Sequence, residues 1–489
     1  MPALILAVGL SAVAIVPLLS PGFFHNHAGL LPAYLAARPL GWATALGLPA
    51  LGPLPHAALA LVQLVSPEPA SALKLLHGAA LLAGTVGAFA AGAALWRLAR
   101  PTRAADAWQG GVLAATLYAA VPLRLAATYV RGDLGEAFAG ALLPWLAALA
   151  LGGAPPAALA GGALALALAQ PALAAGGALA ALALRWAAGR RAFPGPAVAL
   201  ASGVAVGVAA WLPSWRSVGV APVSPDSVQP AHLLLARWGY GTSPEAGMPI
   251  QLGVVAVGGG LIALLAGQWP GRLKAALAGI TAVAVALSLA GPLWSPLVAF
   301  VGQPWLLLGL AALTLVLLAT GLPLPAGREA VASVIALALV ALVAVLNALQ
   351  PIPLAALSRG DPVLAVFGDR VVLLASHRDP PAAPRTITVD WQALADGVED
   401  YRVRLRLLDR DGAPVVERDF VPLNGVRPTG GWVKGEVIRD TLPLPGGLPP
   451  GSYRVGIGLV RANGERLPVR DQQGGRPADE VILAEVTAP

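Results

Sequence analysis

Two patterns of hydrophobic and polar positions divide the chain. As far as about residue 350, long apolar runs follow one another closely, and beyond it apolar and polar residues alternate in short runs. A run of about 18–20 apolar residues can cross a bilayer as a helix. The pattern predicts about eleven spans, at 2–20, 73–96, 109–127, 135–152, 157–172, 173–187, 196–212, 250–267, 274–291, 304–320 and 329–347. The apolar segment 54–65 is too short to span and is expected to lie along the membrane interface.

The pattern of the last part of the chain predicts β structure. Alternation of period two, interrupted by turn residues, predicts short strands and favours an antiparallel sandwich. The clearest runs are 386–391, 401–408 and 453–460, with a further strand within 363–375. Four aromatic residues of this part could stack on sugar rings, but a core role is favoured because three of them lie within alternating runs; they are Trp391, Tyr401, Trp432 and Tyr453. The expected organisation is a membrane domain over 1–350, a linker with a first strand over 351–385, and a sandwich over 386–489.

The distribution of charge supports this division. The chain is 57% hydrophobic and only 12% charged, with a mean hydropathy of +0.72. Residues 1–350 hold 7 acidic and 15 basic residues, whereas 351–489 hold 18 acidic and 17 basic ones. A soluble domain does not dilute charge so far over 350 residues, so the first part is expected in the membrane and the second in water. The basic excess sits in short loops of the bundle, so a nucleic-acid partner is not expected.

Basic residues also predict an orientation, because Lys and Arg accumulate in cytoplasmic loops. With a cytoplasmic N-terminus, nine basic residues fall in short inner linkers: Arg97, Arg100, Arg103, Arg185, Arg190, Arg191, Arg272, Lys274 and Arg328. An odd number of spans then carries the C-terminal domain to the outside. The prediction is a multi-pass protein of the cell membrane with an extracytoplasmic sandwich.

The segment 129–136 is the strongest candidate for chemistry. Arg131, Asp133 and Glu136 stand between two apolar runs, where ionisable groups are costly and persist mainly when they pair or bind a ligand. Asp133 and Glu136 share one helix face, and Arg131 can meet a phosphate or a carboxylate with its planar fork. The alternative interpretation is structural, because acidic residues in a first turn cap free amides and complement the helix dipole.

Other chemistry is limited by composition. The chain has no Cys, which excludes disulfides, thiol catalysis and thiolate metal sites. His25 and His27 are two residues apart and would suit a metal only on an extended strand. Neither a metal site nor a cofactor is therefore predicted.

Several motifs, taken in order along the chain, resemble one family of membrane proteins. They are Ser71–Leu75, Tyr118 with Arg124, Tyr129–Gly132 with Glu136, Leu143-Pro144, Trp211-Leu212-Pro213, Pro292-Leu293-Trp294 and Gln303-Pro304-Trp305. The sequence is similar to the polytopic membrane proteins described as 6-pyruvoyl-tetrahydropterin synthase-related, which resemble glycosyltransferases of the GT-C superfold. The tail resembles the β-sandwich often attached to such transferases.

The resemblance implies transfer of a sugar from a polyprenyl-phosphate donor to a glycan or lipid acceptor at the outer face of the membrane. An acid in the first outer loop would activate the acceptor, and basic residues would hold the departing phosphate. The positions that this implies for substrate binding are Tyr129, Arg131, Gln303 and Trp305, with His25, Asn26 and His27 in the first outer loop.

The chain departs from the family pattern in three polar elements. In the first outer loop, Gly41–Thr44 and Pro53–His56 stand in place of the family's aromatic-Pro-Arg-Trp and Gly-Tyr-Gly segments. Asn26 stands where the family has its first-loop Asp, and an amide cannot accept a proton at neutral pH. Leu306 stands where the family has an Arg. Asp133 and Glu136 are then the candidate catalytic residues. Two function classes remain open: a glycosyltransferase, or an inactive relative that binds lipid or glycan and presents its sandwich to a partner.

Overall fold

A computed structural model of the chain divides it into a helical unit and a β unit, with the boundary between Pro351 and Ile352. The structure describes residues 2–19, 31–36, 52–190, 192–212, 228–234, 249–294, 303–322, 336, 364–379, 386–395, 398–422, 429–432, 437–445, 448–471 and 479–488. The expected span at 329–347 and the first-loop residues His25, Asn26 and His27 lie outside this description, apart from helical residue 336.

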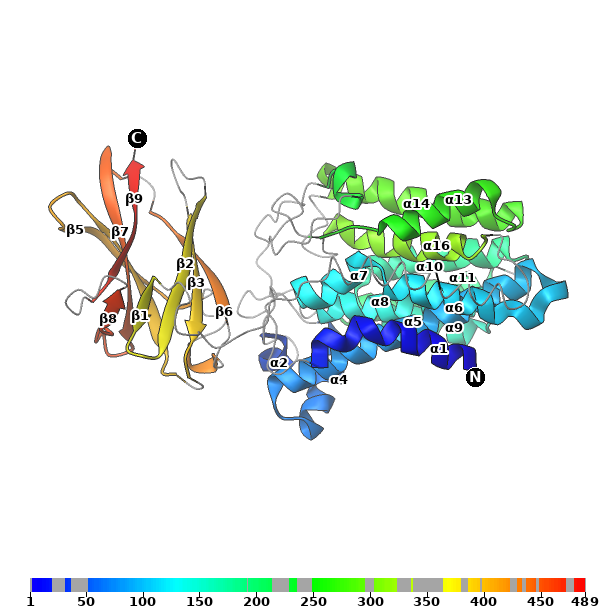
Figure 1. The fold of residues 1–489 in the computed structure, drawn as a ribbon, viewed down its shortest axis with the longest axis horizontal. Coiled ribbons are helices and arrows are strands. Elements are labelled where there is room, and N and C mark those ends of the chain that lie inside the picture. The colour runs from blue at the N-terminus through cyan, green and yellow to red at the C-terminus, as the bar shows by residue number, and fades with distance from the viewer. Residues whose placement is uncertain are drawn as a thin grey trace. The chain divides into compact units, whose positions relative to one another are not determined.

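The helical unit is a bundle whose long helices lie side by side (Figure 1). Its α-helices are α1 (Pro2–Ala12), α2 (Leu31–Ala36), α4 (Pro53–Val65), α5 (Pro69–Ala99), α6 (Ala107–Ala119), α7 (Pro122–Ala126), α8 (Leu134–Gly152), α9 (Pro156–Ala169), α10 (Pro171–Ala187), α11 (Gly195–Ala209), α13 (Val254–Ala266), α14 (Gly271–Leu289) and α16 (Leu308–Ala319). Its short helices are η1 (Val13–Leu19), η2 (Pro101–Asp106), η3 (Ala127–Arg131), η4 (Pro230–Leu233), η5 (Gly291–Trp294) and η6 (Pro304–Leu307).

Proline residues set many of the helix boundaries. A residue before proline is disfavoured in the helical region, while proline itself is tolerated in the first helical turn. Gln170 is extended with φ −155° and separates α9 from α10, which begins at Pro171. Val121 before Pro122 and Gln303 before Pro304 are extended in the same way. Long apolar stretches of the sequence are thereby divided into shorter helices.

The described helices account for only part of the predicted spans. Among the described residues, three helices are long and apolar enough to cross a membrane: Ala70–Ala99, Leu134–Gly152 and Gly271–Leu289. A bent pair, Pro101–Ala119 with Pro122–Arg131, adds a fourth if its 48° bend lies within one span. Six further apolar helices have 10–17 residues. The helical unit is thus membrane-associated, but the described helices that qualify as spans are fewer than eleven.

Small residues allow the helices of the bundle to approach closely. An added Cβ at Gly92 of α5 would lie 2.4 Å from the carbonyl oxygen of Gly110 in α6. An added Cβ at Gly203 of α11 would lie 2.3 Å from the carbonyl oxygen of Ala160 in α9. Such backbone approach is typical of helix packing in membranes, where small residues line the interface.

The β unit contains two antiparallel sheets. One has the order β6-β3-β2-β1-β8 and the other the order β5-β4-β7-β9. Its strands are β1 (Ala365–Phe367), β2 (Val371–Asp379), β3 (Thr386–Ala393), β4 (Tyr401–Leu408), β5 (Pro414–Phe420), β6 (Val437–Pro443), β7 (Gly451–Arg461), β8 (Val469–Asp471) and β9 (Val481–Ala488). Strands β1 and β2 both fall in the interval 351–385, and both belong to the five-stranded sheet.

The two sheets share one hydrophobic core, as the layers of a sandwich do. Buried apolar residues of β4 alternate with more exposed arginines, which confirms the alternation read from the sequence there. In β3 the alternation holds over Thr386–Val389, and the polar residues Asp390 and Gln392 are buried. The aromatic residues of the tail lie in this core: Trp391, Tyr401, Trp432 and Tyr453 are at most 7% exposed. The core interpretation of these aromatics is therefore confirmed, and stacking on an external sugar is excluded for them in this conformation.

Candidate polar centre of the bundle

An irregular turn between α7 and α8 builds the polar centre of the bundle. The chain passes through the π-helical turn η3, and Gly132 then takes a left-handed conformation at φ 66°. Because L side chains rarely adopt this conformation, glycine suits the position. Asp133 follows as the N-cap of α8, and its amide donates to the carbonyl oxygen of Ala127 at 3.0 Å. The turn reverses the backbone so that Arg131 can reach Glu136 in the first turn of α8.

Arg131 and Glu136 form a buried two-point ion pair. Arg131 Nε donates to Glu136 Oε2 at 2.7 Å, and Arg131 Nη2 donates to Glu136 Oε1. The two residues are 6% and 8% exposed. A buried charge persists when it is both paired and hydrogen-bonded, and a bidentate arginine–carboxylate pair meets both conditions. The two opposite charges therefore compensate each other inside the bundle.

The remaining donors of Arg131 bind the backbone. Nη1 donates to the carbonyl oxygen of Pro249 at 3.0 Å, and Nη2 donates to that of Leu123 at 2.9 Å. The guanidinium also lies 4.7 Å from the ring centroid of Trp305 in η6. Each nitrogen of Arg131 is thus engaged by the protein itself, and the side chain joins three separate segments of the chain.

Asp133 acts as a helix cap. Its Oδ1 accepts the backbone amide of Glu136 at 3.1 Å, and its side chain is partly exposed. This contact satisfies one of the amides that lack a partner at every helix start. The two residues considered for catalysis are therefore brought together, one as a cap and the other as half of an ion pair.

The residues considered for substrate binding have different surroundings. Tyr129 is fully buried, and its hydroxyl donates to the carbonyl oxygen of Ala14 at 2.6 Å, which links η3 to η1. Trp305 is 6% exposed and packs over Arg131. Gln303 is the extended residue before η6. The structure thus gathers Arg131, Glu136 and Trp305 in one centre, with Asp133 beside it, and gives Tyr129 a packing role.

A second buried arginine, Arg124, was not singled out as a site residue from the sequence. It is 7% exposed, and its guanidinium donates to the carbonyl oxygens of Ala80 and Leu81 in α5. It also lies 4.7 Å from the ring centroid of Tyr118. An added Cβ at Gly84 would lie 2.5 Å from Arg124 Nη2, so glycine makes room for this side chain. The signal available in the sequence was a lone charge inside an otherwise apolar run.

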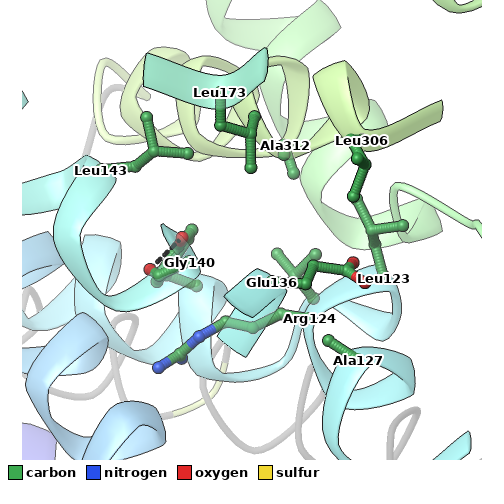
Figure 2. Close-up of a pocket in the computed structure, with 12 residues that line it drawn as sticks. Leu123, Arg124, Ala127, Glu136, Gly140, Leu143, Leu173, Leu306 and Ala312 are labelled. Atoms are coloured by element: carbon green, nitrogen blue, oxygen red, sulfur yellow. Dashed lines mark hydrogen bonds between the residues drawn. The ribbon is translucent and has the colours of Figure 1, made fainter. Parts of the chain in front are cut away.

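A small cavity of about 30 Å³ lies beside this centre. Figure 2 shows Glu136 at the edge of the space, with Leu143, Leu173 and Ala312 on the opposite side, while the guanidinium of Arg124 points away from the space. The lining is mainly apolar: Tyr118, Val121, Leu123, Arg124, Ala127, Glu136, Gly140, Leu143, Leu173, Leu306, Gly309 and Ala312. A cavity of this size holds roughly one or two water molecules. It is too small for a sugar ring in this conformation.

In the described part of the chain, no group of three His, Asp or Glu residues could hold a metal ion. Comparison of the chain with known protein families, with curated proteins and with solved structures finds no match. The arguments about function therefore rest on the geometry of the site.

Proposed function

We propose that this chain is a non-catalytic membrane protein on a GT-C-like frame, which binds lipid or glycan and presents its β-sandwich to a partner. The observation that carries the proposal is the state of Glu136. Both of its carboxylate oxygens accept hydrogen bonds from Arg131. In this arrangement the carboxylate of Glu136 stabilises the bundle through its ion pair with Arg131.

The chemistry of proton transfer supports the same proposal. A general base must reach the proton that it abstracts, either directly or through one water molecule. Glu136 is 8% exposed and faces a cavity of about 30 Å³. One carboxylate oxygen of Asp133 accepts a hydrogen bond from a backbone amide in the first turn of α8. Neither acid has both the freedom and the space that activation of a sugar acceptor would require.

A glycosyltransferase is the second candidate, and one observation favours it. The carboxylate of Glu136 lines the cavity beside Tyr118 and Arg124, so an opening of the bundle would expose an acid to an entering acceptor. The reaction would transfer a sugar from a polyprenyl-phosphate donor at the extracytoplasmic face. This candidate requires the bond between Arg131 and Glu136 to loosen during the reaction.

The proposed topology has about eleven spans and an extracytoplasmic sandwich. It is supported by the inner loops that the sequence predicts, which collect nine of the fifteen basic residues of 1–350. It is also supported by the near balance of acidic and basic residues in 351–489, which is suited to water. The short apolar helices would cross the membrane as broken spans paired with their neighbours.

The test is turnover of polyprenyl-phosphate-linked sugars by the purified full-length protein in lipid. Wild type is compared with Glu136→Gln and Asp133→Asn, and Asp106→Asn serves as a control acid that pairs with Arg103 at 2.9 Å. The proposal expects no turnover from wild type with any donor, while donor or glycan binding is measurable. Turnover that is present in wild type and in Asp106→Asn but lost in Glu136→Gln would establish the transferase instead.

A further inference from the structure

Among the residues that the structure describes, the buried guanidinium of Arg100 at the end of α5 has no hydrogen-bond acceptor. Arg100 is 8% exposed, and its Nε, Nη1 and Nη2 atoms are all buried without an acceptor. Asp106, the nearest acid along the chain, is held by Arg103 at 2.9 Å. The buried arginines Arg124 and Arg131, by contrast, donate to carbonyl or carboxylate oxygens. Arg100 therefore differs from both arginines in that its guanidinium has no acceptor.

Two tryptophans lie against the Arg100 guanidinium. Its Cζ lies 3.9 Å from the ring centroid of Trp96 and 5.3 Å from that of Trp269. The two rings meet edge to face at 5.9 Å and 90°. A cation is attracted to the face of an aromatic ring without using an N–H group as a hydrogen-bond donor to an oxygen. The aromatic contacts therefore hold the side chain while its donors have no acceptor.

The indole N–H of Trp96 is a second buried donor, and Trp96 lies in contact with Arg100. Trp96 is fully buried, and its indole Nε1 also lacks an acceptor. The indole of Trp269, in contrast, donates to the carbonyl oxygen of Leu317 at 3.3 Å. Buried donors normally have partners, and each one left without a partner is costly. Arg100 and Trp96 together present four nitrogen donors without acceptors, and Arg100 is positively charged. Such a group of donors matches an anion with several acceptor oxygens.

We propose that Arg100 and Trp96 form a binding site for a phosphate group, either the headgroup phosphate of a membrane phospholipid or free phosphate. A phosphate presents several acceptor oxygens to the planar donors of an arginine. The end of α5 and the turn between α13 and α14 lie at the same end of the bundle (Figure 1), where Trp and Arg side chains meet lipid headgroups. The phosphate reaches the guanidinium by displacing the groups that cover it.

The test measures thermal unfolding of the full-length protein in dodecyl maltoside, which carries no phosphate. The additions are phosphatidylglycerol, diacylglycerol as its phosphate-free counterpart, and inorganic phosphate against chloride at equal ionic strength. A ligand that binds the folded state raises the unfolding midpoint with its concentration. A rise with phosphatidylglycerol and not with diacylglycerol identifies a lipid site. An equal rise with inorganic phosphate identifies a site for the free anion.

Variants assign the effect to these two residues. Arg100→Gln is expected to weaken the apparent affinity for the phosphate-bearing additive by about 10-fold or more, since a charge-assisted hydrogen bond is lost. Trp96→Phe keeps the stacking ring, removes only the indole N–H, and is expected to weaken the affinity by roughly 3–10-fold. Arg97→Gln removes an exposed charge from the same end of α5 and is expected to bind as wild type does.

Two results would overturn the proposal. One is a wild-type midpoint that neither phosphatidylglycerol nor inorganic phosphate raises above its phosphate-free control. The other is an equal loss of affinity in Arg97→Gln and Arg100→Gln, which would indicate diffuse surface charge. Because Trp96→Phe retains both the charge and the packing, the test still decides if Arg100→Gln fails to fold.

Discussion

At the scale of single residues, one backbone turn decides what the charged residues of the bundle bind. Arg131, Asp133 and Glu136 lie in a part of the chain where charge is rare. Whether such residues bind each other or a ligand depends on a turn that no spacing rule specifies. Here the π-helical turn and Gly132 bring Arg131 onto Glu136. The structural interpretation of Asp133 was available from the first-turn position alone.

The capping role of Asp133 leads to a prediction. Asparagine caps helices about as well as aspartate, whereas alanine cannot accept the amide of Glu136. Asp133→Ala is expected to lower the free energy of unfolding by about 1 kcal/mol, and Asp133→Asn by much less. Denaturant titration of the two variants in the same detergent measures this difference. If Asp133→Asn were as unstable as Asp133→Ala, the charge rather than the cap would be what matters.

A second residue-level prediction concerns Asp419 in the sandwich. Arg404 Nε and Nη2 donate to its two oxygens at 2.7 and 2.8 Å. These hydrogen bonds lower the pKa of Asp419 below its usual value of 3.8 and outweigh the opposing effect of partial burial. The depressed pKa stabilises the fold above the usual value, and this stabilisation is lost as the pH falls through the folded-state pKa.

Amide hydrogen exchange along β4 measures this effect when wild type and Asp419→Asn are compared at each pH. Above pH 4 the variant is expected to be less stable by roughly 0.2–1 kcal/mol, the range of a largely solvent-screened pair. The difference should vanish in more acidic solution. Asp411→Asn, at an exposed turn position, serves as the control. A difference that stays constant down to the lowest pH would contradict the assigned cause.

At the scale of elements, periodicity predicted where helices and strands form, and proline decided where they end. Strand β4 occupies the predicted run 401–408. Strand β5 carried no such signal, because its Pro414–Phe420 segment is exposed or half-buried throughout and so lacks alternation. Strand β8 has three residues, too few for any pattern. The described helices that are long enough to span are fewer than the predicted runs, because runs such as 157–172 and 173–187 form helices of only 14 and 17 residues.

Close packing of α9 on α11 gives a prediction for this scale. An added Cβ at Gly203 would lie 2.3 Å from a backbone oxygen, so the helices must separate to accept it. Gly203→Ala is expected to cost about 1–3 kcal/mol of folding stability. Gly161 lies in α9, but a Cβ there would meet nothing within 4 Å. Gly161→Ala is therefore expected to be neutral or stabilising by up to about 1 kcal/mol. Equal effects in unfolding experiments would contradict the packing.

At the scale of the whole molecule, the density of charged residues distinguishes the two units. Lipid and water differ strongly in how well they solvate a charge. Residues 1–350 carry 22 of the 57 charged residues, and 351–489 carry 35. Local interactions do not enter that argument, so it does not depend on where single helices begin or end. The orientation in the membrane follows from loop charge and remains a prediction.

Orientation can be measured cleanly because the chain has no native cysteine. Single cysteines are placed at Asp411, in the exposed turn after β4, and at Thr102, in the exposed segment after α5. A membrane-impermeant maleimide is expected to label Asp411→Cys in intact cells, and Thr102→Cys only after permeabilisation. The reverse pattern would place the sandwich in the cytoplasm.

The most direct test of the central claim is a double-mutant cycle on Arg131 and Glu136, measured as free energy of unfolding in lipid or detergent together with sugar transfer. Arg131→Met and Glu136→Leu are each expected to cost about 3–5 kcal/mol, because each leaves a buried charge without its partner. The double variant should recover most of that loss and bind lipid or glycan as wild type does. Single variants that keep full stability while abolishing a measurable sugar transfer would contradict the account and make this pair an active centre.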